Sequence, residues 1–435
     1  MPEAAGETSL LRAVGAWGLA ASIVNVTVGG GIFRLPAAAA GSLGAAAPIA
    51  YVVCAFAMGL IALCFAQAGS RVSMTGGPYA YVEVAFGPFV GFIAGVLVWL
   101  LGTLAVAAVS TILTDSIGAL APSLDGPAPR ALMLVAIFVL LGGVNVLGVR
   151  QGTLVNAFAT AAKLLPLVLL VVAGVFAIRP ANLVWTLRPA PAAVARASIL
   201  LIFAFSGVES ALVPSGEIKD VRRTVPRAIL VAMSVITLLY LALQMVAQGV
   251  LGADLATQRA PLAETAAGVF GPWGRTLMLT GAIVSMFGYV SGMTLAVPRA
   301  LYAFARDGFL PRRVAAVHPR FHTPYVAILL QSTLVCLLAI TNGFETLAIL
   351  ANLATLILYG ACCLAAWELR RREVATPDST LRARASDVIP WAACAVILWM
   401  LTSVTWREWA VAGATIAVAA LLFLATRGRR RRAAA

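Results

Sequence analysis

The sequence predicts an all-α membrane protein with twelve transmembrane helices. Hydrophobic residues make up 61% of the 435 residues and charged residues only 11%, so the chain lacks the polar surface that a soluble protein of this length needs. A helix crosses the hydrocarbon core with about 20 apolar residues, and the apolar runs of this chain reach that length. The runs are continuously apolar and do not alternate, which argues against a β-barrel.

Twelve apolar segments bounded by charges, Pro or Gly are the predicted spans. In chain order they are residues 13–40, 45–69, 87–117, 131–149, 153–178, 197–218, 226–250, 274–304, 324–341, 345–369, 387–404 and 408–426. The first segment could instead be a cleaved signal peptide, because Arg12 precedes it and small residues stand at 37–40. Glycines that interrupt its apolar core, and the further spans that follow, favour a transmembrane helix.

The distribution of Lys and Arg predicts that both termini are cytoplasmic. With this orientation, 22 of the 31 cations lie in cytoplasmic segments and seven lie outside. The net charge of +14 is then a topology signal and requires no nucleic acid partner. The basic cytoplasmic tail, residues 427–435, could also contact anionic membrane lipid. We therefore expect a multi-pass protein of the cell membrane.

Two polar interruptions occur at matching places in the apolar segments. Gly29-Gly30-Gly31 interrupts the first segment, and the stretch 206–210 interrupts the sixth. Residues 13–178 can be laid over residues 197–369, five spans on five, so that both interruptions fall in the first helix of each half. The odd number of spans inverts the second half in the membrane. Residues 1–12 are then a cytoplasmic N-terminus, and residues 387–426 form two additional helices.

The interruptions are suited to a ligand with both charges of an α-amino acid. Backbone groups freed by a helix break inside a membrane must be satisfied, and a bound polar ligand can do this. The amides and the dipole of the helix that restarts after Gly31 favour a carboxylate. Carbonyl oxygens freed near Thr27 and Ser206 suit an ammonium group. The alternative is that the glycines form a close helix-packing patch, but the matched second break favours the ligand site.

These interruptions and two further motifs resemble the amino acid-polyamine-organocation (APC) transporter superfamily. The motifs are Gly29–Phe33, the loop Gly76–Tyr81, and Phe203–Ser210 followed by Thr224-Val225-Pro226. The likeness spans nearly the whole chain. It implies the LeuT-type fold, a five-plus-five inverted repeat with discontinuous helices one and six. It also implies a substrate site between helices one, three, six and eight, and transport by alternating access.

The resemblance also implies residues for the substrate site. The carboxylate would be held by amides of the glycine run Gly29, Gly30 and Gly31, and the α-ammonium by carbonyls of Thr27, Phe203 and Ser206. Phe203 and Met293 stand where arginine/agmatine antiporters of this superfamily have tryptophan, which argues against a long guanidinium substrate. Together with Ser206 they indicate a pocket for a modest side chain. Alternatively, Phe203 and Met293 are lipid-facing filler.

Lys163 is the predicted proton-coupling group. It lies in the fifth span without a nearby sequence partner, and an ionisable residue within a membrane usually marks function. Some proton-coupled members of the superfamily have a lysine on helix five that faces the first break, and Lys163 matches it. Since desolvation favours the neutral amine, Lys163 could exchange a proton during the cycle. The alternative is a fixed charge that ties helices one, five and eight together.

Other polar residues near the breaks have two interpretations each. Glu209 matches a glutamate that acts as a gate and a proton-sensitive group in some antiporters, but it could equally cap freed amides. Arg34 could pair with an acid or attract anionic substrate, or it could extend toward the membrane interface. Asp115 is expected to be a helix-end residue. Gln67 stands where relatives often have glutamate, and the charged loop 217–226 could close the inner pathway or serve only as a topology signal.

Metal and enzyme chemistry find little support in the sequence. The six cysteines lie in apolar spans without metal-ligand spacing, and Pro319 between His318 and His322 disfavours a regular helical site. There is no metal triad, nucleophile–base spacing or phosphate loop that would indicate an enzyme. No cofactor is expected, and protons are the expected coupling ion.

We therefore expect a secondary active transporter that takes up small or neutral amino acids together with protons. One alternative is an antiporter that exchanges cationic amino acids for amines. An alternative of another class is a channel or a nutrient-sensing receptor built on a transporter scaffold. The sequence does not determine the oligomeric state or a partner subunit.

Overall fold

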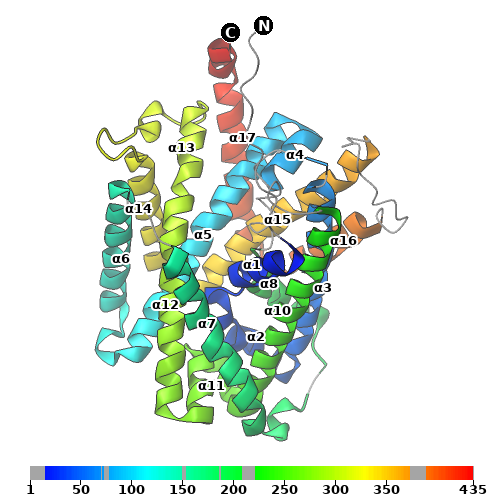
Figure 1. Cartoon of the computed structure of the whole chain (residues 1–435). Helices are drawn as coiled ribbons and strands as arrows, with labels where there is room; N and C mark the ends of the chain where they lie inside the picture. Colours follow the sequence, from blue (N-terminus) through cyan, green and yellow to red (C-terminus); the bar gives the residue numbers. More distant parts are fainter. Residues whose placement is uncertain are drawn as a thin grey trace.

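The computed structural model describes residues 15–69, 71–72, 78–148, 153–185, 188–207, 221–372 and 388–434. Within these ranges every regular element is a helix, and Figure 1 shows the longer ones gathered in one bundle. In this described part, seven helices are long and apolar enough to cross a membrane, and shorter apolar helices accompany them. The all-helical membrane class is therefore confirmed, whereas the number of twelve spans stays a prediction.

Each predicted span overlaps at least one α-helix, and the helix ends differ from the predicted ones. In chain order they are α1 (Ala16–Thr27), α2 (Leu35–Leu43), α3 (Pro48–Gly69), α4 (Pro78–Phe86), α5 (Pro88–Leu120), α6 (Pro127–Leu147), α7 (Thr153–Gly174), α8 (Pro191–Phe205), α10 (Val221–Leu251), α11 (Pro261–Phe270), α12 (Pro272–Ala296), α13 (Pro298–Arg306), α14 (Tyr325–Thr341), α15 (Phe344–Arg371), α16 (Val388–Leu401) and α17 (Trp406–Ala434). Short 3₁₀ turns join some of them: η1 (Gly30–Phe33), η2 (Gly44–Ala46), η3 (Pro122–Leu124), η4 (Val175–Ala177), η5 (Pro180–Leu183), η7 (Gly252–Thr257) and η8 (Arg312–Ala315).

Proline sets where many of these helices begin. Pro88, Pro127, Pro191, Pro261 and Pro272 stand in the first turn of α5, α6, α8, α11 and α12. The missing N–H costs nothing there, because the first amides of a helix have no intrahelical acceptor. The same signal explains α4 and α11, two short helices that lie outside the predicted spans and begin at a proline.

The first predicted span is discontinuous, as expected. It is divided into α1 and α2 by the turn η1. The sixth span is interrupted as well, because α8 ends at Phe205 and Gly207 takes a positive φ of 119°. Residues 208–220 lie outside the described residues, so the second half of that span cannot be placed. The inverted repeat and the proposed domain boundaries stay predictions.

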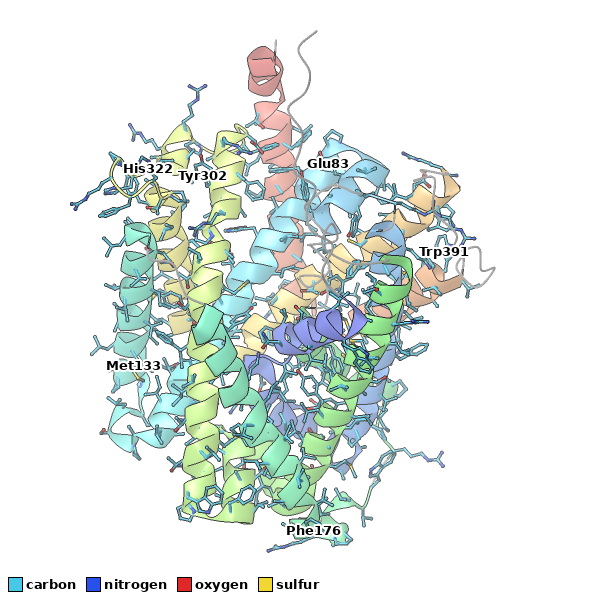
Figure 2. The ribbon with its side chains drawn as sticks, in the orientation of Figure 1. Glu83, Met133, Phe176, Tyr302, His322 and Trp391 are labelled. Atoms are coloured by element: carbon cyan, nitrogen blue, oxygen red, sulfur yellow. The ribbon has the colours of Figure 1, made fainter. Side chains whose placement is uncertain are left out.

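The bundle has a buried centre and an apolar periphery. In the apolar stretch of α15, 72% of the residues are buried, against 17% in that of α17. α5 packs along α15, and Figure 2 shows Phe176 and Trp391 at the margin of the molecule, where they are 90% and 52% exposed. Large exposed apolar side chains over so much of the surface fit contact with lipid. The helix breaks lie inside this shell.

The eighth predicted span contains a joint. We expected one helix over 274–304, but the structure has α12 ending at Ala296 and α13 beginning at Pro298. Val297 keeps right-handed helical angles, so the chain continues in nearly the same direction. Pro298 has no N–H to donate to the preceding turn, which is why the hydrogen-bond ladder is interrupted here.

Candidate functional site

The first break exposes backbone donors inside the bundle. Gly29 is extended, with φ −112° and ψ −159°, and the 3₁₀ turn that follows begins at Gly30. Within the described residues, the amides of Gly29, Gly30 and Gly31 donate to no carbonyl. Gly30 and Gly31 are buried, so their donors need a partner that the described protein does not provide. A carboxylate is the group that such a helix start binds best.

The second break touches the first. A Cβ added at Gly207 would lie 3.2 Å from Cγ1 of Val26 and 3.5 Å from Cα of Thr27. Its positive φ is also one that side-chain-bearing residues rarely adopt. Glycine at 207 therefore lets the end of α8 approach the end of α1 closely, and the two interruptions form one region of the molecule.

Tyr240 joins the ends of the two broken helices. This residue of α10 is fully buried, and its hydroxyl lies 3.3 Å from the carbonyl oxygen of Thr27 and 3.0 Å from that of Ala204. A phenol has one proton to donate, so one of the two oxygens can still accept from another donor. We did not single out Tyr240 from the sequence, where a phenol in a long apolar segment was the available signal.

Lys163 reaches the end of α1 from α7. Its Nζ donates a hydrogen bond to the carbonyl oxygen of Asn25 at 2.5 Å, and the side chain is half-buried. Asn25 lies in the last turn of α1, where the helix dipole places partial negative charge. No carboxylate of the described residues pairs with this ammonium group. The structure thus places Lys163 at the last turn of α1, just before the first break.

Three side chains close over the glycines. A Cβ on Gly31 would lie 2.8 Å from Cδ1 of Phe203, and one on Gly30 would lie 3.0 Å from both Met286 and Val109. Phe203 comes from α8, Val109 from α5 and Met286 from α12. The glycines therefore allow a close approach that an alanine would prevent, and the described conformation is closed around them.

Met286, which the sequence reasoning missed, takes the place beside Gly30. The predicted pocket residue Met293 lies further along α12, where its Cε is 3.8 Å from a Cβ built on Gly102. Gly102 and Val109 are two turns apart on α5, about 10 Å at 1.5 Å per residue. Met286 and Met293 are two helical turns apart, so the helical period of α12 places both on the same face. The sequence does not show which of the two lies beside the first break.

A charged cavity is lined by the neighbour of Phe203. The Phe203 ring packs edge-on against Phe344, with centroids 5.5 Å apart, and Phe344 lines a cavity of about 500 Å³. We call this cavity the vestibule. Its charged lining residues are Arg34, Asp115, Asp125, Arg130, Arg259 and Glu345. The Phe203–Phe344 pair therefore links the glycine run to the wall of the vestibule.

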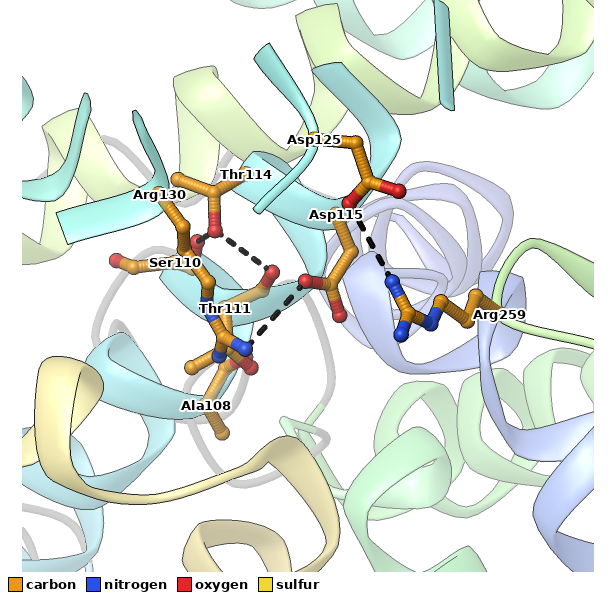
Figure 3. A network of polar contacts seen from close by, with 8 residues as sticks. All are labelled: Ala108, Ser110, Thr111, Thr114, Asp115, Asp125, Arg130 and Arg259. Atoms are coloured by element: carbon orange, nitrogen blue, oxygen red, sulfur yellow. Dashed lines mark hydrogen bonds and ion pairs between the residues drawn. The ribbon is translucent and has the colours of Figure 1, made fainter. Parts of the chain in front are cut away.

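Long-range polar contacts shape the vestibule, and Figure 3 shows two of its ion pairs. Arg130 lies 3.7 Å from Asp115, and Arg259 lies 3.3 Å from Asp125. Arg34 donates to the carbonyl oxygen of Gln258 at 3.1 Å, which ties the restarted half of the first span to the segment before α11. Asp115, expected to be only a helix-end residue, thus forms part of the cavity wall.

Several predicted residues lie outside the described residues. Glu209 is among them, as are Gly76 and Gly77 of the loop motif and residues 217–220. In the part that is described, no group of His, Cys, Asp and Glu side chains could hold a metal ion. His318 instead accepts hydrogen bonds at Nδ1 from the amides of Arg320 and Phe321, and so orders its loop.

A bundle of apolar helices with two touching helix breaks at its centre defines a membrane transporter. The chain belongs to the amino acid permease family, whose family model matches residues 14–427, and the APC resemblance is thereby confirmed. It is 27% identical to a branched-chain amino acid permease of Bacillus subtilis over 418 residues, which cover 92% of this chain and 90% of the relative.

Two other relatives are named for different substrates. A methylthioribose transporter of Bacillus subtilis is 26% identical over 433 residues, covering 95% of this chain and 93% of the relative. A serine/threonine exchanger of the same organism is 26% identical over 361 residues, covering 80% of this chain and 81% of the relative. Membership of this family therefore establishes that the protein is a transporter.

Proposed function

We propose that the protein is a secondary active transporter that takes up small or neutral amino acids together with protons. The observation that carries the proposal is the contact between two helix breaks, one presenting unsatisfied buried amides and the other presenting helix-end carbonyls. This arrangement is complementary to the carboxylate and ammonium groups of an amino acid zwitterion. The branched-chain permease and the serine/threonine exchanger among the relatives support small or neutral side chains.

In this proposal the substrate binds mainly to the backbone. Amides of Gly30 and Gly31, beside Gly29, hold the carboxylate. Carbonyl oxygens hold the ammonium, and they belong to Thr27, Phe203 and Ser206. The hydroxyl of Tyr240 already lies 3.3 Å from the Thr27 oxygen, so an ammonium there would leave this hydroxyl to the Ala204 oxygen. Substrate binding would thereby alter the contact between the two broken helices.

The side-chain pocket is small. Phe203 and Met286 approach the glycines closely, so a bound substrate must displace their side chains. A methionine rearranges easily because it is unbranched and has three rotatable bonds. Movement of Phe203 would also separate it from Phe344 and open the glycine run to the vestibule, which supplies one of the two pathways that alternating access needs. Met293 remains a prediction for the other end of this pocket.

Lys163 is the proposed proton-coupling group, and Glu209 is the second candidate. A proton on Lys163 supports the hydrogen bond to the Asn25 carbonyl and favours the described position of α1. Loss of that proton removes the attraction between Nζ and the negative end of the helix. Protonation at this residue is thereby linked to the position of the helix that carries the glycine run.

Proteoliposomes with an imposed pH gradient test the proposal. Uptake of radiolabelled L-leucine and L-serine into vesicles without internal amino acid is expected to rise when the outside is acidic. Lys163→Gln is expected to abolish this stimulation while exchange between two amino acid pools continues. The matched control is Arg179→Gln, an exposed cation away from the breaks, which should behave as the wild type. Equal stimulation in Lys163→Gln would remove Lys163 from the coupling mechanism.

Exchange is the second candidate function, because one relative is a serine/threonine exchanger. An obligatory exchanger takes up nothing into empty vesicles and requires internal amino acid. A channel or a receptor would show neither saturation nor acceleration by internal substrate. Methylthioribose belongs in the same assay, since a neutral sugar has no carboxylate for the glycine amides; transport of it alone would contradict the zwitterion site.

A further inference from the structure

Asn352 connects α15 to the broken helix α8. This asparagine lies within α15 among apolar residues and is only 1% exposed. Its Nδ2 donates to the carbonyl oxygen of Ile199 at 2.7 Å and lies 3.3 Å from that of Leu200. Both acceptors belong to α8. Because a buried amide is costly unless it is hydrogen-bonded, these contacts tie α15 to α8 at a defined place.

The hydrogen bond of Asn352 leaves the helix that carries it. Thr355, one turn further along α15, instead donates within its own helix, to the carbonyl oxygen of Ala351 at 2.8 Å. Asn352 spans the interface at which α15 and α8 pack against each other. A polar contact between two membrane helices fixes their relative rotation better than apolar packing does. Asn352 therefore determines how the end of α8 is turned.

The acceptors of Asn352 lie just before the second break. In an α-helix the carbonyl oxygen of residue 199 also accepts the N–H of residue 203, so one oxygen joins the Asn352 amide to the backbone of Phe203. α15 contacts Phe203 a second time through Phe344, whose ring is edge-on to the Phe203 ring with the centroids 5.5 Å apart. Helix α8 ends two residues later, at Phe205. Both contacts from α15 thus act on the last turn before the break.

We propose that Asn352 is a positioning residue for the ammonium half of the substrate site. It fixes the rotation of the last turns of α8, and thereby the carbonyl oxygens of Phe203 and Ser206 that accept the substrate ammonium. Asn352 acts through α8 and not through contact with the substrate. Acceptors that are already held in place need less ordering when the ligand arrives, which raises affinity. This inference rests on the proposed function and adds α15 to the elements that determine substrate affinity.

Competition binding to the full chain in lipid nanodiscs tests this role. The radiolabelled probe is L-leucine or, if leucine does not bind, the amino acid that raises the melting temperature most in a panel of all twenty. The competitor is the acid with the same side chain and no amine, which for leucine is 4-methylpentanoate. Asn352→Leu is expected to weaken amino acid binding by about three- to tenfold, the size of one hydrogen bond. The affinity for the competitor should stay as in the wild type, because that acid has no ammonium for the carbonyl oxygens of α8.

Gln331→Leu is the matched control, because it also removes a buried amide that joins two helices. It should lower the melting temperature as Asn352→Leu does, but leave both affinities unchanged. Asn352→Ala removes the same donors with a smaller side chain, and it replaces Asn352→Leu if that variant does not fold. A role in stability alone would weaken the binding of the amino acid and of the competitor equally.

Hydrogen exchange gives a measurement that needs no ligand. The backbone amides of residues 199–205 should exchange faster in Asn352→Leu than in the wild type, and at the wild-type rate in Gln331→Leu. Unchanged exchange, unchanged amino acid affinity, or an equal loss of affinity for the competitor would each overturn the positioning role and leave the proposed function standing. If the wild type binds none of the twenty amino acids, the proposed function fails instead, and the exchange rates alone decide whether Asn352 holds α8.

Discussion

Gly31 shows why single residues matter at the first break. Its Cα faces the Phe203 ring so closely that a methyl group would lie 2.8 Å from Cδ1, well inside van der Waals contact. The ring in turn contacts Phe344, so an added methyl group would press Phe203 against it. Glycine is required here for close approach and not for a left-handed backbone, since its φ is not positive.

The first prediction concerns this contact. Gly31→Ala is expected to lower substrate affinity by about tenfold or more, since overpacking costs roughly 1–3 kcal/mol. The matched control is Gly41→Ala in α2, where nothing lies within 4 Å of the added methyl group. Binding and uptake are measured for both variants in the same vesicles. Normal affinity in Gly31→Ala would show that Phe203 yields and that the glycine is not needed for packing.

Lys163 and Tyr240 both lie at the breaks, but only Lys163 could be recognised from the sequence. Lys163 stands out by its charge in an apolar helix, and the structure places it at the end of α1. Tyr240 carries no charge and resembles any aromatic residue of a membrane helix. Its contacts, to Thr27 and Ala204, join residues 213 and 36 positions apart, and only the packing of α10 brings them together.

At the scale of elements, α5 and α14 are joined by a buried polar network. Trp99 donates to Gln331 at 2.9 Å, and Gln331 donates to Thr103 at 3.0 Å. Gln331 is only 2% exposed, and both ends of its amide are used. Hydrogen bonds between helices in a membrane fix their relative rotation and position. Apolar packing alone does this poorly, because an apolar helix face can contact lipid as readily as another helix.

The second prediction tests this network. Gln331→Leu keeps a similar side-chain size but leaves the Trp99 N–H without its acceptor, so stability is expected to fall by about 1–2 kcal/mol. The melting temperature of the purified protein reports this loss. Amino acid affinity should change little, because α14 does not line the glycine run. If the variant has the melting temperature of the wild type, apolar packing and not this network holds α5 and α14 together.

The broken helices also show how elements depend on one another. α2 has nine residues and cannot span a membrane by itself. It packs against α8 and η7, and Arg34 ties its first turn to the Gln258 carbonyl. Tertiary contacts, not helix length, therefore hold the half-helix in position.

At the scale of the whole molecule, the vestibule and the cation-rich segments lie at different ends of the helices. α5 reaches the vestibule near its C-terminal end, through Thr114 and Asp115, and α15 reaches it at its first residues. The distribution of Lys and Arg predicts that the vestibule opens to the outside. The basic turn η8 would then face the cytoplasm.

The third prediction tests this orientation. In a chain with its six cysteines replaced, Ser123→Cys in η3 should react with a membrane-impermeant maleimide in intact cells, because it is exposed next to the vestibule. Arg312→Cys in η8 is equally exposed and should react only after the cells are permeabilised. The reverse pattern would invert the topology and assign the vestibule to the cytoplasmic pathway.

The sequence by itself determined the helical membrane class and the positions of both interruptions, because apolar length and runs of glycine are local properties of the chain. It also predicted a lysine against the first break through a resemblance to relatives. The tertiary structure decided which side chains lie around the breaks, Met286 beside Gly30 and Tyr240 between the two broken ends, and which arginines line the vestibule. These contacts depend on how far each helix is shifted and rotated against its neighbours. Helix packing sets that shift and rotation, and an apolar sequence leaves many packings nearly equivalent.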